Sequence, residues 1–285
     1  ICRGLQSEGR LKFIGLTRFR AFFWRPKIDG KFDLVTSQDP FETGMIAKRL
    51  AKITGAKHEL QIHTDIGSPY FWKESLKNKI SFLIARFLLP KADHIRAVSQ
   101  RIADSLQSAS WRIKADIEVK PIFVDVEKIK NTPITIDLHK KYPQFDKIIL
   151  MASRLAREKN IGLAIEAVYD ANMRMRANDT NRKILLLIVG SGPEEKKLKA
   201  KSYYLEANVV FENWINQEIL YSYYKTCDLF LVTSLYEGYG MTLVEAHAAG
   251  CKIVSTDVGV AREVGARIVE SDYLNVASGI IKSLQ

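Results

Sequence analysis

The alternation of apolar runs with helical stretches after residue 148 constrains the fold of this 285-residue chain more than any other feature. Short apolar runs bounded by turn residues are typical of parallel strands that are buried on both faces. Such runs predict strands at 148–152, 184–189, 229–233 and 252–255. Helical stretches lie at 161–176, 194–204, 217–225 and 241–249, and Gly250 stands where a helix-ending glycine belongs. This order predicts a doubly wound α/β sheet with right-handed crossovers.

The first half of the chain shows a less complete form of the same alternation. Its runs predict strands at 32–37, 59–63 and 94–98, each next to a helical stretch. Residues before Phe32 supply no opening strand with a glycine-rich turn, although a doubly wound domain normally begins with one. We therefore expect the first domain to lack its first strand, and we expect the chain to stop within a helix at 280–285.

Two α/β domains are the predicted organisation. The chain is long enough for two domains of ordinary size, which we place at residues 1–145 and 146–285. The polar segment 133–143 is the predicted linker between them. Hydrophobic residues make up 47% of the chain and charged residues 26%, a composition that excludes a disordered protein.

The three cysteines and the absence of long apolar segments indicate a cytoplasmic protein. Cys2, Cys227 and Cys251 are widely spaced, odd in number and without metal-ligand spacing, so we expect reduced thiols. The best candidate for a membrane span, residues 80–89, is about half the required length and contains Arg86. The N-terminus lacks the pattern of a signal peptide.

The net charge of +11 is confined to the first half of the chain. Residues 1–145 contain 26 Lys and Arg against 15 Asp and Glu, whereas residues 146–285 contain 17 of each kind. An anionic partner such as a phospholipid surface would explain the excess, and so would a solvated basic face; both interpretations stay open. Residues 70–91 interleave cationic and aromatic side chains and fit either a membrane surface or a core helix leading into the strand at 94, which is the interpretation we favour. Residues 18–27 are the better candidate for membrane contact, because they lack a clear place in the fold.

A strand, a glycine-bearing turn and a helix follow one another between residues 229 and 250. The turn contains Glu237 and Gly240, the helix opens near Met241, and Glu245 lies about one turn into the helix. Backbone N–H groups at a helix start favour phosphate. Because two acids would repel a phosphate, we expect them to bind sugar hydroxyls instead.

The same strand–loop–helix order recurs at residues 152–161. Arg154 and Lys159 place two cations at the carboxyl edge of a neighbouring strand. Together with a helix start, these cations would neutralise the charge of a diphosphate leaving group.

These segments resemble the retaining GT-B glycosyltransferases of family 4, also called glycosyltransferase group 1. Glu237 and Glu245, with seven residues between them, resemble the E-x7-E signature of that family. In the second half, residues 153–159 resemble its phosphate-binding loop, 189–193 the turn after its second C-lobe strand, and 257–263 its closing motif. In the first half, the segments 33–40, 61–65 and 92–99 resemble its acceptor-lobe strands. The resemblance covers roughly residues 32–275 and implies two Rossmann-like lobes that face each other across a cleft, the first of them incomplete.

The resemblance implies a role for each matching residue of the second lobe. Glu237 is expected to touch the hydroxyls of the donor hexose, and Glu245 is expected to hold the ribose. Arg154 and Lys159 are expected to bind the β-phosphate. Backbone amides for the diphosphate are expected from Gly240, Met241 and Thr242.

In the first lobe, the resemblance places His63 at the end of an acceptor-side strand, facing the donor sugar. It implies no metal and no cofactor, with the nucleotide-diphosphate sugar as donor substrate. The expected activity is retaining transfer of a hexose from a UDP- or GDP-sugar to a glycan or a polyprenyl-linked acceptor in cell-envelope polysaccharide synthesis. The expected location is the cytoplasm, with peripheral contact at the inner face of the membrane.

Three other functions stay open. A nucleotide-sugar epimerase of the same fold would leave the sugar on the nucleotide. A truncated, inactive chain would bind a nucleotide sugar or a membrane surface without turnover. Nucleic-acid binding by the basic half would depend steeply on salt, but we find no recognition motif and do not expect it.

Overall fold

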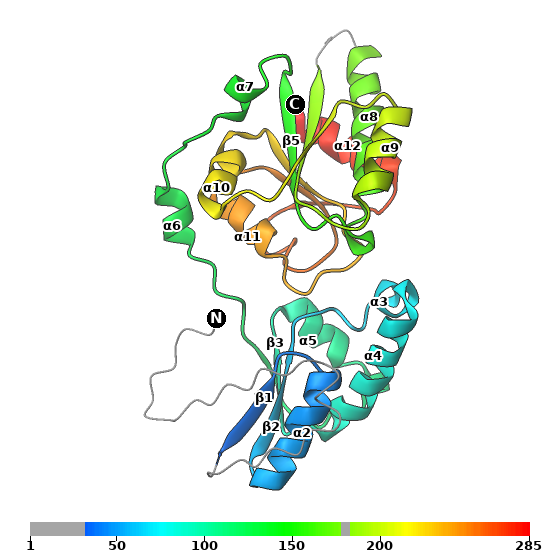
Figure 1. The fold of residues 1–285 in the computed structure, drawn as a ribbon, viewed down its shortest axis with the longest axis vertical. Helices are drawn as coiled ribbons and strands as arrows, with labels where there is room; N and C mark the ends of the chain where they lie inside the picture. The colour runs from blue at the N-terminus through cyan, green and yellow to red at the C-terminus, as the bar shows by residue number, and fades with distance from the viewer. Residues whose placement is uncertain (1–31, 178–182) are drawn as a thin grey trace.

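The computed structural model describes residues 32–177 and 183–285, which form two α/β lobes stacked along the long axis of the molecule (Figure 1). The predicted absence of an opening strand and the proposed membrane contact at 18–27 lie outside the described residues, as does Cys2. No helix within the described ranges has the length and apolar character needed to cross a bilayer.

The second lobe is a six-stranded parallel sheet with the strand order β10-β9-β8-β5-β6-β7. Its strands are β5 (Lys147–Ala152), β6 (Ile184–Val189), β7 (Val209–Glu212), β8 (Leu229–Val232), β9 (Ile253–Thr256) and β10 (Arg267–Val269). Its helices are α8 (Ile161–Ala177), α9 (Glu195–Tyr204), α10 (Gln217–Thr226), α11 (Met241–Ala248) and α12 (Tyr273–Leu284). The predicted doubly wound sheet is confirmed.

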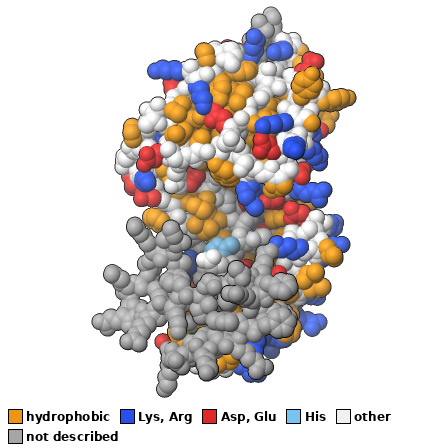
Figure 2. Space-filling view, in the orientation of Figure 1, with side chains coloured by type: hydrophobic (Ala, Val, Ile, Leu, Met, Phe, Trp, Pro, Cys, Tyr) orange, Lys and Arg blue, Asp and Glu red, His pale blue; other side chains and the backbone are white. Residues whose placement is uncertain are grey.

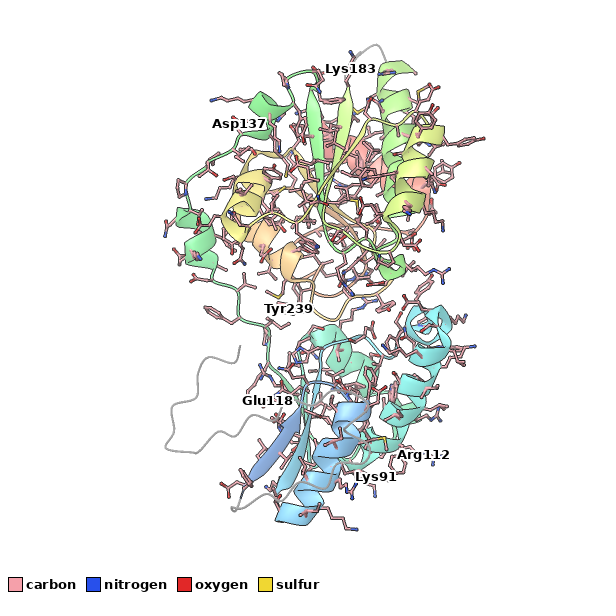
Figure 3. All side chains as sticks on the ribbon, in the orientation of Figure 1. Lys91, Arg112, Glu118, Asp137, Lys183 and Tyr239 are labelled. Atoms are coloured by element: carbon pink, nitrogen blue, oxygen red, sulfur yellow. The ribbon has the colours of Figure 1, made fainter. Side chains whose placement is uncertain are left out.

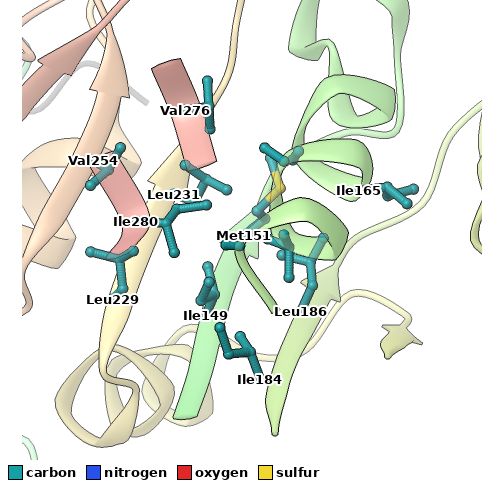
Figure 4. Close-up of a cluster of buried hydrophobic side chains, with 14 of the residues drawn as sticks. Ile149, Met151, Ile165, Ile184, Leu186, Leu229, Leu231, Val254, Val276 and Ile280 are labelled. Atoms are coloured by element: carbon teal, nitrogen blue, oxygen red, sulfur yellow. The ribbon is translucent and has the colours of Figure 1, made fainter. Parts of the chain in front are cut away.

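Alternate residues of the central strands enter two separate cores on the two faces of this sheet. Ile149 and Met151 of β5 pack beneath α8 and α12, as Figure 4 shows, whereas Ile148 and Leu150 enter the core beneath α10 and α11. Because both faces are covered, every residue of β6 is buried. This double burial is the reason why these strands appear in the sequence as continuous apolar runs.

The first lobe contains a four-stranded parallel sheet whose described strands run in chain order, β1-β2-β3-β4. The strands are β1 (Leu34–Ser37), β2 (Lys57–Ile62), β3 (His94–Ala97) and β4 (Ile117–Val119). The helices are α2 (Glu42–Thr54), α3 (Pro69–Glu74), α4 (Leu76–Leu88) and α5 (Gln100–Leu106). Residues 70–91 thus form α3, α4 and a short 3₁₀ turn, and α4 contributes Ala85 and Leu88 to the core as expected.

The segment between the lobes differs from the prediction. It contains α6 (Val126–Asn131) and α7 (Leu138–Lys141), and Ile129 and Leu138 are fully buried in the core of the second lobe. The predicted linker at 133–143 is therefore packed on the second lobe, and the chain crosses between the lobes before α6 (Figure 1). The division at residue 145 stays a prediction.

Candidate functional site

The candidate site lies at the carboxyl edge of the second sheet, where the strand order reverses. β5 pairs with β6 on one side and with β8 on the other, so the loops that follow β5 and β8 lie next to each other. A crevice opens at such a switch point in doubly wound sheets, and ligands bind there. The sequence predicted both loops, but only the strand order brings them together.

Close packing between loops fixes the loop after β5. A Cβ atom on Gly190 would lie 2.0 Å from the carbonyl oxygen of Ser153, and one on Gly192 would lie 2.4 Å from that of Leu155. On the other side, the Thr233 hydroxyl donates to the carbonyl groups of Lys159 and Asn160, at 3.1 Å each. The loop is thus held from both neighbouring strands, and the glycine turn after β6 serves this approach.

Lys159 and Glu237 form an ion pair across the crevice. The Lys159 ammonium group donates to Glu237 Oε1, and the Ser234 hydroxyl donates to the same oxygen at 2.8 Å. Both charged side chains are largely buried, with 18% of each exposed. Lys159, which was predicted to bind phosphate, therefore contacts Glu237, which was predicted to bind the sugar.

Arg154 lies at the entrance of the same loop and is much more accessible. Its guanidinium donates to Glu158 Oε1 at 2.8 Å, and 70% of its side chain is exposed. Water screens the charge of this exposed guanidinium, so Arg154 can turn toward a ligand at small cost. Glu158 also accepts a backbone hydrogen bond from Leu235, which ties the two loops together at 2.8 Å.

The predicted phosphate-binding turn adopts a conformation that opens a helix. Gly240 is the N-cap of α11 and has a φ of 85°, in the left-handed region that favours glycine. Met241 and Thr242 follow as the first helical residues, whose N–H groups have no partner within a helix. Their position agrees with the predicted phosphate contacts, which stay predictions.

Glu245 is buried beneath the crevice, with 6% of the residue exposed. Its carboxylate accepts hydrogen bonds from Tyr224 at 3.2 Å and Gln217 at 3.4 Å, both on α10. Burial raises the pKa of the Glu245 carboxyl, while the two hydrogen bonds oppose this effect. Tyr224 and Gln217 were not predicted, because no local pattern links α10 to α11. A carboxylate held in this manner suits sugar hydroxyls rather than a metal.

His63 lies immediately after β2 in the first lobe, opposite the loop that carries Glu237. A Cβ atom on Gly238 would lie 1.8 Å from the His63 carbonyl oxygen, and the Ser99 hydroxyl donates to the Gly238 carbonyl at 2.9 Å. Tyr239, the next residue, lies at the lower edge of the second lobe, facing the first (Figure 3). The His63 side chain is half-buried; burial and the nearby Arg96 lower its pKa, against a smaller opposing effect of Asp39.

Further contacts between the lobes were not predicted. The Tyr236 hydroxyl donates to Glu74 at the end of α3, and Arg101 of α5 pairs with Asp257 at 3.0 Å. A pocket of about 480 Å³ lies between the lobes beside this second pair, and Asp65 and Arg262 also line it. Among residues 32–177 and 183–285, no three His, Cys, Asp or Glu side chains are grouped to hold a metal ion.

Two family models match the chain, one for each half. The model described as "Glycosyl transferases group 1" matches residues 136–267, and the model described as "Glycosyltransferase Family 4" matches residues 6–128. The chain belongs to the group 1, family 4 glycosyltransferases. The resemblance noted in the sequence is therefore confirmed at the level of the family.

Curated relatives of this glycosyltransferase chain are considerably longer than it is. An alpha-monoglucosyldiacylglycerol synthase of Streptococcus pneumoniae is 24% identical over 79% of the chain and 52% of the relative. The N-acetylgalactosamine-N,N'-diacetylbacillosaminyl-diphospho-undecaprenol 4-alpha-N-acetylgalactosaminyltransferase of Campylobacter jejuni is 31% identical over 64% of the chain and 47% of the relative. The chain spans about half the length of the curated relatives it matches.

A solved structure shows the fold of this glycosyltransferase chain. The Anabaena protein HepE, in complex with UDP and glucose, superposes with a TM-score of 0.70 at 20% sequence identity. The superposition covers 89% of this chain and 69% of HepE. The predicted GT-B architecture of two Rossmann-like lobes is thus confirmed.

Proposed function

We propose that this glycosyltransferase moves a hexose from a UDP- or GDP-sugar to a glycan or lipid-linked acceptor, with retention at the anomeric carbon. The observation that carries the proposal is the Lys159–Glu237 pair, which lies at the switch point of the second sheet. The pair is close in sequence to the start of α11 at Gly240 and faces the first lobe near His63. The Lys159 cation and the start of α11 suit the two phosphates of a sugar diphosphate, and the Glu237 carboxylate suits the sugar hydroxyls.

Lys159 and Arg154 would stabilise the leaving diphosphate. As the bond between the anomeric carbon and the β-phosphate oxygen breaks, negative charge grows on that oxygen. Two cations and the positive end of the α11 dipole oppose this charge in a partly dry crevice, where electrostatic stabilisation is strong. We propose that this arrangement suffices without a metal ion.

Retention would follow from attack on the face that the diphosphate leaves. The acceptor oxygen bonds to the anomeric carbon, and the acceptor proton passes to the departing phosphate oxygen. Glu237 would hold sugar hydroxyls, and no covalent nucleophile is then needed. The lowered pKa of His63 keeps its imidazole neutral at pH 7. From its place in the first lobe, this imidazole would form a hydrogen bond with the sugar.

The acceptor class is proposed from the relatives. One relative is named for a product on diacylglycerol, and another for transfer to a saccharide on diphospho-undecaprenol. Both names contain a lipid, diacylglycerol in one and undecaprenol in the other. We extend that class to this chain and place its activity in the cytoplasm, at the inner face of the membrane.

Binding of nucleotides tests the donor site. We would measure UDP, GDP and ADP binding by calorimetry for the wild type, for Glu245→Ala and for Glu218→Ala as a matched control on the exposed surface of α10. We expect one nucleotide to bind, and we expect Glu245→Ala to lose at least tenfold in affinity, because the charged hydrogen bonds to the ribose disappear. A folded wild-type chain that binds none of the three would refute the donor site.

Product analysis then separates transfer from epimerisation. With the identified nucleotide sugar and a lipid-linked acceptor, transfer releases free nucleoside diphosphate, whereas an epimerase leaves the sugar on the nucleotide. The anomeric configuration of the product, read by NMR coupling constants, must equal that of the donor if the reaction proceeds with retention.

A further inference from the structure

The outward face of α4 carries a continuous apolar stripe that the elements described between residues 32 and 285 leave exposed. Leu76, Ile80, Leu83 and Phe87 follow the spacing of one helix face, and between 51% and 75% of each is exposed. The opposite face of α4, with Ser81, Ala85 and Leu88, is buried in the first lobe. The helix is thus apolar on two sides, although a core helix needs only one.

Cations surround this stripe, and acids are absent from it. Lys77, Lys79, Arg86 and Lys91 are the four charged side chains between Ser75 and Lys91. Lys91 places its ammonium group 3.1 Å from the centre of the Phe87 ring, and Lys48 of α2 lies 5.4 Å from the same ring. Positive charge therefore borders the apolar side chains along the whole helix.

The neighbouring helix α3 adds aromatic side chains of the kind that prefer a water–lipid boundary. Tyr70 and Trp72 are exposed, and the Lys73 ammonium lies 5.6 Å from the centre of the Trp72 ring. Figure 2 shows hydrophobic and cationic side chains next to each other at the right margin of the lower lobe, where Figure 1 places α3 and α4.

We propose that this face, formed by α4 and the adjoining α3, docks on the surface of an anionic lipid bilayer. A 13-residue helix is about 20 Å long, enough to lie in the interface with its apolar stripe among the acyl chains. The lysines would then meet the lipid phosphates. A protein partner is less well matched, because all four charged side chains between Ser75 and Lys91 are cationic and would require an acidic counterpart.

The position of α3 links this face to the interlobe cleft. Phe71 of α3 packs edge-on against Tyr236 of the second lobe with 5.8 Å between ring centres, and Glu74 accepts a hydrogen bond from the Tyr236 hydroxyl. A bilayer on this face would thus lie beside the cleft, where an acceptor carried by a lipid could enter. This consequence rests on the proposed function; lipid binding itself does not.

Flotation with lipid vesicles tests the proposal. We would compare vesicles of phosphatidylglycerol and phosphatidylcholine with vesicles of phosphatidylcholine alone, at low and high salt. We expect the wild type to float with the anionic vesicles at low salt only. Ile80→Gln with Leu83→Gln should lower the partition coefficient about tenfold or more. Lys77→Gln with Lys79→Gln should lower it about 30-fold, at about fivefold per charge.

Matched variants on α9 of the second lobe provide the control. Tyr203→Gln with Tyr204→Gln removes two exposed aromatic side chains, and Lys196→Gln with Lys197→Gln removes two exposed charges. Both should bind vesicles as the wild type does. Wild-type chain that fails to float, α4 variants that bind normally, or control variants that lose binding equally would each overturn the proposal.

Sedimentation velocity and nucleotide binding complete the test. If the wild type is a dimer that the α4 variants convert to monomers, the face is an interface between copies and the proposal is wrong. UDP or GDP binding should be unchanged in the α4 variants. A wild-type chain that binds vesicles but no nucleotide would refute the proposed function and leave the lipid-binding face intact.

Discussion

The Lys159 ammonium group donates a hydrogen bond to the Glu237 carboxylate, and this contact joins the loop after β5 to the loop after β8. The two residues are 78 positions apart in the chain. Each neutralises the other, so neither is left as an unpaired charge in a partly buried crevice. A bound sugar diphosphate would offer Lys159 a second anion and Glu237 a set of hydroxyl donors.

Removal of Lys159 should weaken binding of the diphosphate and spare the nucleoside. A charged hydrogen bond contributes about 1.5–3 kcal/mol, so Lys159→Ala should lower UDP affinity roughly 10- to 100-fold. Uridine affinity should change less than threefold, about 0.6 kcal/mol. Calorimetry with both ligands checks this, and Lys199→Ala, which removes a cation paired with Glu195 on α9, is the control. An equal loss for UDP and uridine would argue against a phosphate contact.

Glu237→Gln should separate catalysis from nucleotide binding. The substitution weakens the contact with sugar hydroxyls at the reaction centre, so we expect the transfer rate to fall about 100-fold or more. UDP affinity should stay the same or rise slightly, because Lys159 is released from its partner. Steady-state kinetics and calorimetry measure the two effects, with Glu218→Gln as an exposed control. A lower UDP affinity at an unchanged rate would contradict the assignment.

Glu245→Gln should stabilise the fold while weakening nucleotide binding. Burial raises the carboxyl pKa, so the folded chain binds this proton more tightly than the unfolded chain does. Stability linked to Glu245 is therefore present below its unfolded pKa of about 4.3 and is lost as pH rises through the folded value. Glutamine avoids the buried charge, and we expect a gain of about 1 kcal/mol at pH 7 in urea unfolding. A clear loss of stability would show that the ionised carboxylate is itself stabilising.

His58 should make the chain less stable in acid. It is 2% exposed on β2, and neither ring nitrogen has a hydrogen-bond partner in the described part of the chain. Burial and Lys48 lower its pKa, with a smaller opposing effect of Asp93. Stability linked to this residue is present above the unfolded pKa of about 6.5 and is lost as pH falls toward the folded value.

His58→Leu should reduce that loss of stability in acid. Urea unfolding between pH 5 and 8 measures it, and we expect the variant to gain about 1 kcal/mol more at pH 5.5 than at pH 8. His247→Leu, at an exposed position of α11, is the control and should retain the wild-type slope. Identical slopes for wild type and His58→Leu would exclude this residue as a source of acid sensitivity.

Gly238→Ala should separate the lobes without damage to either. The added methyl group would lie 1.8 Å from the His63 carbonyl oxygen, a distance that no relaxation of a flexible side chain can relieve, because the obstacle is backbone. We expect the transfer rate to fall at least tenfold while UDP affinity stays within twofold, about 0.4 kcal/mol. Gly162→Ala meets only the end of Lys201 at 3.3 Å and should be tolerated. Normal transfer by Gly238→Ala would mean that the contact is dispensable.

The exposed stripe on α4 illustrates a limit of pattern reading in the first lobe. The sequence allowed 70–91 to be a core helix, the favoured interpretation, or a membrane-contacting one, and the structure shows one face of α4 buried and the opposite face apolar and exposed. Periodicity could not decide, because apolar residues that serve a core and those that serve another surface follow the same helical spacing.

The sequence by itself determined four strands and four helices of the second lobe and the composition of its site. Buried parallel strands must be apolar on both faces, so β5, β6, β8 and β9 are visible as unbroken apolar runs. The glycine that opens α11 and the acids around it are local features as well, because backbone conformation and helix starts depend on nearby residues.

Only the tertiary structure decided which of these elements meet. β4 and β10 have three residues each, too few for a periodic signal, and the packing of Leu138 on the second lobe depends on contacts distant in sequence. The Lys159–Glu237 pair exists because β8 lies beside β5, and Glu245 meets Tyr224 because α10 lies beside α11. A local sequence pattern depends on which faces of its own segment are buried or exposed, whereas strand order and helix packing depend on the whole chain.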